Sequence, residues 1–258
     1  MKKTSYIALL LIFCLSIFSC GSDTLPVTVI QLDEDLELHL WQNLTTDGAQ
    51  AQIKLVTTDL YDCAEARIIS DLSTFGKSIN LELTAIEQPD NCATASATQI
   101  TSLHPIDFGQ GQYDIRITLG DLITNEGEMS FSNEKIELSL HSSNGLKFNN
   151  STLQRIPNNI VWGYIIHPDH QAAISDELLD SIEISNSSGL SAGNYTYFKV
   201  NNNGSVNILD TNQEHTGFVI NYQSSSDWEQ IKSNFAASNQ VDDADIYIQN
   251  YNGEFLRN

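Results

Sequence analysis

Hydrophobic and polar residues alternate in several short segments of the first half of the chain. Segments 36–41, 79–84, 113–119 and 136–140 each carry an apolar residue at every second position. A period of two turns one side of a strand toward a core and the other toward water, as in antiparallel sheets. With the apolar runs at 27–30 and 52–56, the pattern predicts at least six strands before residue 141, with no helix between them. Such a series of strands predicts a mainly β class and an antiparallel β-sandwich.

Turn-forming residues divide the chain into two domains. Residues 142–158 are rich in Ser, Asn and Gly and contain Pro157, a composition typical of turns and boundaries. We therefore predict a β-sandwich domain at 27–141, with an immunoglobulin-like arrangement as one form of it, a linker at 142–158 and a second domain at 159–258.

The second domain mixes strand and helix patterns. Asn203-Gly204 separates two strand-like runs at 194–200 and 205–209 and predicts a hairpin, because Asn-Gly supplies the positive φ values of a tight turn. Ser226 and Asp227 offer cap oxygens to a helix ending near 235. Its apolar residues at i, i+3 and i+7 share one face. Strands at 160–166, 217–222 and 246–248, and a short helix at 176–182, complete a predicted α+β domain with an antiparallel sheet.

The first twenty residues have the pattern of an export signal. Lys2 and Lys3 precede an apolar run from Tyr6 to Phe18. At roughly a dozen residues, this run is shorter than the roughly 20 that a membrane-spanning helix needs. The pattern predicts a signal peptide at 1–19, with a short N-terminal anchor helix as the alternative.

The residues that follow point to a lipid anchor. The segment Ile17–Cys20, with the sequence Ile-Phe-Ser-Cys, resembles the lipobox of bacterial lipoprotein precursors, and the resemblance covers residues 1–23 only. It implies cleavage before Cys20, a diacylglycerol on the Cys20 sulfur, and residues 20–26 as a lipidated tether. Several acyl chains together anchor a protein stably, whereas a single chain is marginal.

Charge and the residue after Cys20 restrict the location and the partners. Twelve Lys and Arg against 33 Asp and Glu give a formal charge of −21 at pH 7. A surface this acidic repels phosphate backbones, which excludes nucleic acid as a partner. Gly21 stands where Asp retains some lipoproteins at the inner membrane. The resemblance thus favours the outer membrane, on its periplasmic or its surface face, with the N-terminal lipid as the membrane contact.

Two cysteines remain in the mature chain once the signal and the lipidated residue are set aside. Cys63 and Cys92 are expected to pair as a disulfide in the oxidising envelope. Two free thiols are the alternative. A metal pair is less favoured, because neither has a second Cys or His at ligand spacing.

Aromatic residues concentrate in the second domain and suggest a binding surface. If 194–200 is one strand, Tyr195 and Tyr197 lie on the face opposite Phe198 and Val200. We expect this tyrosine pair to be exposed and to contact a small-molecule, glycan or protein ligand.

A serine motif suggests a hydrolase as an alternative function. Gly189–Gly193 matches the G-x-S-x-G pattern around Ser191, and Asp210 and His215 follow in the order of α/β-hydrolases. That nucleophile elbow needs a strand before the serine and a helix after it. Because a strand is expected to follow, a loop entering a hairpin is the simpler interpretation.

Metal sites are further alternatives. His167 and His170, with Glu177 nearby, could hold zinc with an open position, although Pro168 argues against both histidines lying on one helix face. Calcium could be held by acidic clusters, but their sequence lacks the glycine of a calcium loop, so solvated loops are the simpler interpretation. These clusters comprise Asp33, Glu34, Asp35, Glu37, Asp242, Asp243 and Asp245. We expect no resident cofactor.

Together these features favour a lipid-anchored envelope lipoprotein that acts as a non-catalytic binding or structural module. One alternative is an envelope hydrolase that uses Ser191 or a metal at His167 and His170. Another is an accessory subunit of an outer-membrane assembly.

Overall fold

The described part of the chain starts after the predicted signal peptide and tether. The computed structural model describes residues 27–30, 36–94, 97–120, 122–148, 150–166, 189–209, 211, 213–222, 225–238 and 245–257. The signal peptide at 1–19, Cys20 with the tether to residue 26, and the helix expected at 176–182 lie outside these residues.

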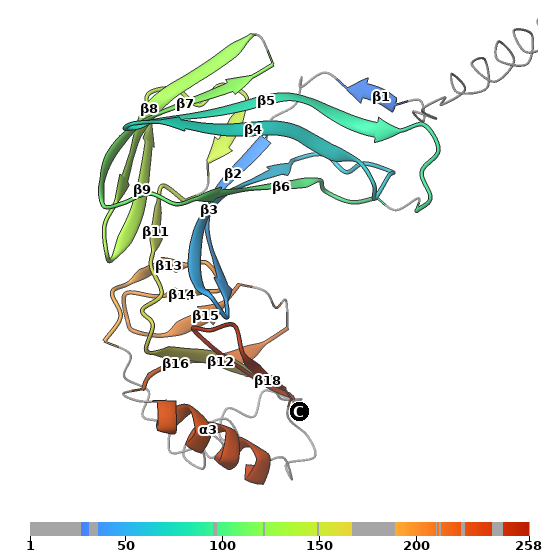
Figure 1. Cartoon of the computed structure of the whole chain (residues 1–258). Coiled ribbons are helices and arrows are strands. Elements are labelled where there is room, and N and C mark those ends of the chain that lie inside the picture. Colours follow the sequence, from blue (N-terminus) through green and yellow to red (C-terminus); the bar gives the residue numbers. More distant parts are fainter. Residues whose placement is uncertain are drawn as a thin grey trace, which may run out of the picture.

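Two sheets form the N-terminal unit (Figure 1). The larger runs in the order β1-β5-β7-β8-β9-β11, and β4 also pairs with β5. The smaller runs in the order β10-β2-β3-β6. The strands of the larger sheet are β1 (Val27–Ile30), β4 (Arg67–Phe75), β5 (Ser78–Pro89), β7 (Gly111–Leu119), β8 (Ile123–Phe131), β9 (Lys135–Leu140) and β11 (Thr152–Gln154). Those of the smaller are β2 (Leu36–Thr45), β3 (Gly48–Thr57), β6 (Thr101–Ile106) and β10 (Leu146–Phe148).

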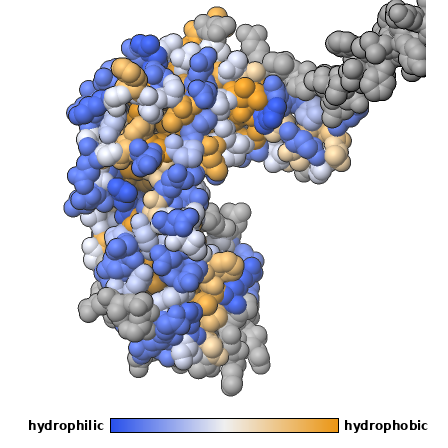
Figure 2. Space-filling model, viewed as in Figure 1, coloured by the Kyte–Doolittle hydropathy of each residue, from blue (hydrophilic) through white to orange (hydrophobic). Residues whose placement is uncertain are grey.

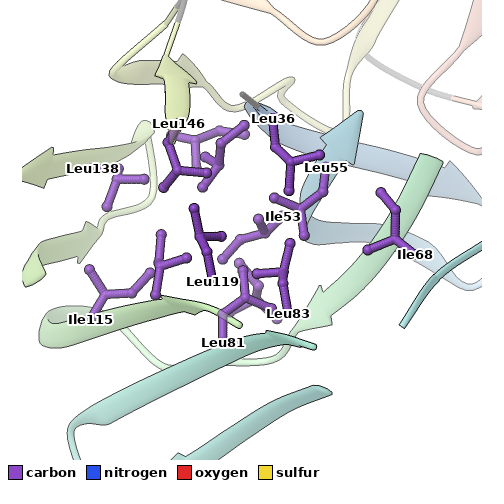
Figure 3. Packing of buried hydrophobic residues seen from close by; sticks show 14 of the residues in the cluster. Leu36, Ile53, Leu55, Ile68, Leu81, Leu83, Ile115, Leu119, Leu138 and Leu146 are labelled. Atoms are coloured by element: carbon purple, nitrogen blue, oxygen red, sulfur yellow. The ribbon is translucent and has the colours of Figure 1, made fainter. Parts of the chain in front are cut away.

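The alternating apolar residues of these strands meet in one core. Leu38 and Ile53 of the smaller sheet and Leu83 and Ile117 of the larger are fully buried in the same cluster. Figure 3 shows leucines and isoleucines from several strands converging on this core. Burial on one side of each strand is the cause of the period of two. The mainly β class predicted from that period is confirmed.

The strand arrangement differs from a purely antiparallel sandwich in two places. β5 pairs with β7, and β2 with β10, in parallel. Parallel neighbours need a crossover connection. Here the chain visits β6 in the other sheet between β5 and β7.

Several strands were not predicted. Within residues 142–158, expected to be a linker, β10 and β11 add to the two sheets. β4, β6 and β8 were also missed. In β8 the buried positions include Asn125 and Gly127, whose polar and small side chains hide the apolar period. Gly127 is needed there because a Cβ would collide with the backbone of Ser139 on β9.

The C-terminal unit is an antiparallel sheet with a helix on one face (Figure 1). The sheet order is β13-β14-β15-β16-β12-β17-β18. Its strands are β12 (Ile160–Ile166), β13 (Gly193–Tyr195), β14 (Phe198–Val200), β15 (Val206–Ile208), β16 (His215–Asn221), β17 (Asp245–Asn250) and β18 (Phe255–Arg257). Helix α3 (Ser225–Ser238) buries Trp228, Ile231 and Phe235 against this sheet, as their spacing predicts.

The hairpin predicted around Asn203-Gly204 is confirmed, but the strand before it is shorter than expected. β14 and β15 pair across this turn, and Gly204 has a φ of +83°. Residues 194–200 are not one strand, because the chain turns at 196–197 between β13 and β14.

The end of the β2–β3 hairpin reaches into the C-terminal unit (Figure 1). The Gln42 N–H donates to Thr196 Oγ1 at 2.7 Å, and Gln42 Oε1 accepts from the Ile156 N–H at 2.9 Å. Leu44, near the end of β2, is buried in a cluster with Trp162 and Phe198. One strand pair therefore belongs to the cores of both units.

The outer surface is largely hydrophilic on the face seen in Figure 2, with smaller apolar areas. Within the described ranges, no helix combines the length and apolarity that crossing a membrane requires.

Candidate functional site

The C-terminal sheet carries aromatic side chains on the face opposite α3. Along β12, Val161 and Ile165 belong to the core beneath the helix. Trp162 belongs to the hydrophobic cluster on the other side of the sheet, and Tyr164 packs against that cluster. β17 follows the same alternation, with Ile246 and Ile248 in the helix-side core. Its intervening Tyr247 and Gln249 line the opposite face.

A row of rings crosses this face from strand to strand. Tyr164 and Tyr247 are direct partners in the β12–β17 register, and their ring centroids lie 5.3 Å apart at an interplanar angle of 16°. Phe255 continues the row at 6.0 Å from Tyr247, and His215 lies on the other side at 5.9 Å from Tyr164. Phe255 is 63% exposed. We call His215, Tyr164, Tyr247 and Phe255 the aromatic row.

A groove of about 210 Å³ lies beside the aromatic row. We call it the aromatic groove, and it is lined by Trp162, Tyr164, Tyr197, Ile208, Tyr247 and Gln249. Tyr197 stacks on Trp162 with centroids 5.4 Å apart, and it also contacts Trp41 of β2, edge to face at 5.7 Å. The β2–β3 hairpin of the sandwich thus supports one end of the groove.

Among the described residues, the groove has no charged lining residue but several hydrogen-bonding groups. The Tyr247 hydroxyl donates to Gln249 Oε1 at 2.9 Å. The Gln249 Nε2 and the Tyr164 hydroxyl make no hydrogen bond within the described residues, whereas Trp162 contributes a side chain that is only 2% exposed. The groove therefore offers aromatic surface and neutral donors, which suits binding of an uncharged ligand.

The expected exposed pair of Tyr195 and Tyr197 is not formed. Tyr195 is 2% exposed, its ring stacks on Phe198 at 4.9 Å, and its hydroxyl donates to the Ser191 carbonyl. Burial raises the pKa of Tyr195 above its usual value. The turn at 196–197 separates the two tyrosines, so the alternation of a single strand does not apply. Only Tyr197 reaches the groove.

Cys63 and Cys92 are joined by a disulfide with their Cα atoms 5.6 Å apart. The bond links the segment before β4 to the segment after β5. Glu65 lies close enough to complete a group of three potential metal ligands, with all ligand atoms within 4.8 Å of one another. A metal would need the thiolates, which the disulfide does not offer.

The surroundings of Ser191 differ from a nucleophile elbow. β13 follows the serine directly, where the elbow needs a helix. His215 has both ring nitrogens engaged by the backbone, because Nδ1 donates to the Gln213 carbonyl at 2.8 Å and Nε2 accepts from the Ile208 N–H at 3.1 Å. Neither nitrogen is left to take a proton from a serine. Asp210 lies outside the described residues.

Most of the other proposed ligands also lie outside the described residues: His167, His170, Glu177, Asp33, Glu34, Asp35, Asp242 and Asp243. Of the acidic clusters considered for calcium, two residues are described. Glu37 lies 3.3 Å from the ring of His39, and Asp245 begins β17.

A second depression lies on the outer face of the larger sandwich sheet. It measures about 450 Å³ and includes Glu128, Ser130 and Glu137 in its lining. Glu137 is already paired with Lys135 at 2.8 Å, and Glu128 is exposed to water. Solvated polar residues of this kind are the normal outer face of a sheet, so the aromatic groove is the stronger candidate.

Sequence reasoning found the aromatic content of the second domain but missed the aromatic row and the groove. The alternation of Tyr247 and Gln249 with Ile246 and Ile248 was the available signal. Their neighbours come from strands that are distant in sequence, so their pairing could not be read locally. No protein-family model, no curated protein and no solved structure matches this chain.

Proposed function

We propose that the protein is a lipid-anchored lipoprotein of the bacterial envelope in which the C-terminal unit acts as a non-catalytic binding module. The anchor rests on the export signal and on Cys20 in its lipobox-like segment. The binding module rests on one observation, the uncharged aromatic groove in the C-terminal sheet.

The positions of the start of β1 and of the aromatic groove support a spacer role for the sandwich. β1 begins seven residues after Cys20 (27 − 20) and pairs with the end of β5 in the N-terminal unit. The strands β12, β15 and β17, whose residues line the aromatic groove, belong to the other unit (Figure 1). A lipid at Cys20 would therefore hold the sandwich nearest the bilayer and leave the groove accessible to ligands in the surrounding compartment.

The composition of the groove supports binding rather than catalysis. The six lining residues within the described ranges include no carboxylate, thiol or imidazole, which are the usual groups for proton transfer or nucleophilic attack. Aromatic side chains contribute contact area at a low cost in side-chain entropy, which is typical of recognition surfaces.

The anchor can be tested by expressing the full chain in its native host and analysing the N-terminus by mass spectrometry. The expected product begins at Cys20 with added acyl chains and partitions into the detergent phase. Cys20→Ser should leave the precursor unlipidated, whereas the control Cys14→Ser, also in the predicted leader segment, should be processed normally. A wild-type product that keeps its leader, or begins at Cys20 without lipid, contradicts the anchor.

The non-catalytic role is tested with purified mature protein and panels of ester, peptide and glycoside substrates. We expect no turnover above background. Turnover that disappears in Ser191→Ala, or serine-probe labelling that disappears in the same variant, would show instead that the protein is a hydrolase.

A further inference from the structure

We infer that the aromatic groove binds a proline-rich segment of a partner protein in the polyproline II conformation. This inference rests on the proposed function and specifies its ligand. It is argued from the orientation of the rings, the hydrogen-bonding groups and the charge of the groove.

The rings of the groove form two stacked pairs. Tyr164 and Tyr247 are nearly parallel at 5.3 Å, and Trp162 and Tyr197 are nearly parallel at 5.4 Å. These spacings are too short for two rings to lie side by side in one plane, so each pair overlaps face to face with an offset. In the Tyr164–Tyr247 pair, ring edges and the Tyr164 hydroxyl, rather than open ring faces, are left for a ligand. A sugar ring that stacks on an aromatic residue needs an open face, whereas proline-rich segments dock between aromatic side chains in grooves.

The unused polar groups of the groove suit a ligand that mainly accepts hydrogen bonds. The Tyr164 O–H and the Gln249 Nε2 are donors without partners in the described part of the chain. The one side-chain amide acceptor of the groove, Gln249 Oε1, already accepts a hydrogen bond from the Tyr247 hydroxyl. A polyproline II chain has no internal hydrogen bonds, and its prolines contribute carbonyl acceptors but no N–H donor. A sugar, by contrast, brings a donor with each of its hydroxyl groups, and these donors would need acceptors in the groove.

Charge and size agree with an extended, uncharged chain. The lining residues that the structure describes are all neutral, and the protein carries a formal net charge of −21, which disfavours acidic ligands. The volume of about 210 Å³ is below the range of roughly 300–1,000 Å³ typical of pockets that enclose a small molecule. A groove of this size can contact only a few residues of a longer peptide. A polyproline II segment is already extended before binding, so it loses little conformational entropy.

The test uses mature protein from residue 20 onward, prepared without lipid, and a decaproline peptide that has no aromatic residue. Binding is followed by the change in tryptophan fluorescence, because Trp162 lines the groove. We expect saturable binding to the wild type. Tyr164→Phe removes one donor and should weaken binding about fivefold, the equivalent of one hydrogen bond of about 1 kcal/mol. Tyr247→Ala should weaken it at least tenfold, with folding checked by circular dichroism.

The matched control is Phe75→Ala, which removes an aromatic side chain that is 86% exposed on β4 of the sandwich. It should leave decaproline binding unchanged. Binding that survives both Tyr164→Phe and Tyr247→Ala would overturn the inference. So would the absence of saturable decaproline binding to the folded wild type; binding of soluble oligosaccharides at the groove would then leave the binding module intact. Failure of the proposed non-catalytic role is seen separately, as turnover in the substrate panels.

Discussion

The contact that Gln42 makes between the two units leads to a specific prediction about stability. Gln42 is 2% exposed, and its Oε1 is the acceptor for the buried N–H of Ile156, which lies in the segment between the units. Gln42→Met keeps a side chain of similar length but removes this acceptor. The Ile156 N–H would then be buried without a partner.

The expected cost follows from that single unpaired group. A buried donor left unsatisfied costs about 1–3 kcal/mol, a substantial part of the roughly 5–15 kcal/mol that a folded domain typically has. For a chain of this length, each kcal/mol corresponds to about 2–4 °C in Tm. We therefore expect Gln42→Met to lower Tm by several degrees. Because the β2–β3 hairpin contributes to both cores, both units should lose stability together.

The assay is urea and thermal unfolding followed by circular dichroism and by tryptophan fluorescence. The matched control is Gln110→Met, which removes an exposed side chain bonded to Asn133 and should change the free energy of unfolding by less than about 0.5 kcal/mol. Equal effects of the two substitutions would refute the role of Gln42. Two separate transitions, of which only one moves, would refute the shared core.

Three further predictions concern other parts of the molecule. Reducing the Cys63–Cys92 disulfide, which closes a separation of 29 residues, should lower the free energy of unfolding by about 3–4 kcal/mol, and an unchanged urea midpoint in reductant would contradict this. Burial lowers the pKa of His104 below 6.5, so the unfolded chain takes up a proton more readily than the folded one, and stability should fall as pH drops below about 6.5. His104→Gln should flatten this dependence in urea unfolding between about pH 7 and 5; an identical slope in the variant would exclude His104 as its cause. Gly163→Ala should destabilise the protein by about 1–3 kcal/mol, because its Cβ would collide with the backbone of Tyr247, and a thermal unfolding curve like that of the wild type would disprove this contact.

The sequence by itself determined the features that depend on neighbouring residues. Alternation placed the core-facing side of β2, β5, β7 and β9, the spacing of Trp228, Ile231 and Phe235 placed one face of α3, and Asn203-Gly204 marked a hairpin. Each of these signals lies within a few positions of the chain, because side-chain direction repeats every two residues in a strand and every 3.6 in a helix. Strands whose inward positions are polar or small, such as Asn125 and Gly127 of β8, carry no such signal.

Only the tertiary structure decided how these elements combine. The aromatic groove brings together β12, β15, β17 and the turn after β13, and Trp41 supports it from the sandwich. The partnership of Tyr164 with Tyr247 is a matter of strand register between segments about eighty positions apart (247 − 164 = 83). The turn at 196–197, which buries Tyr195 and leaves Tyr197 at the groove, is likewise stabilised by contacts with β2. Register and strand order follow from the burial of whole faces against one another, so they cannot be read from a local pattern.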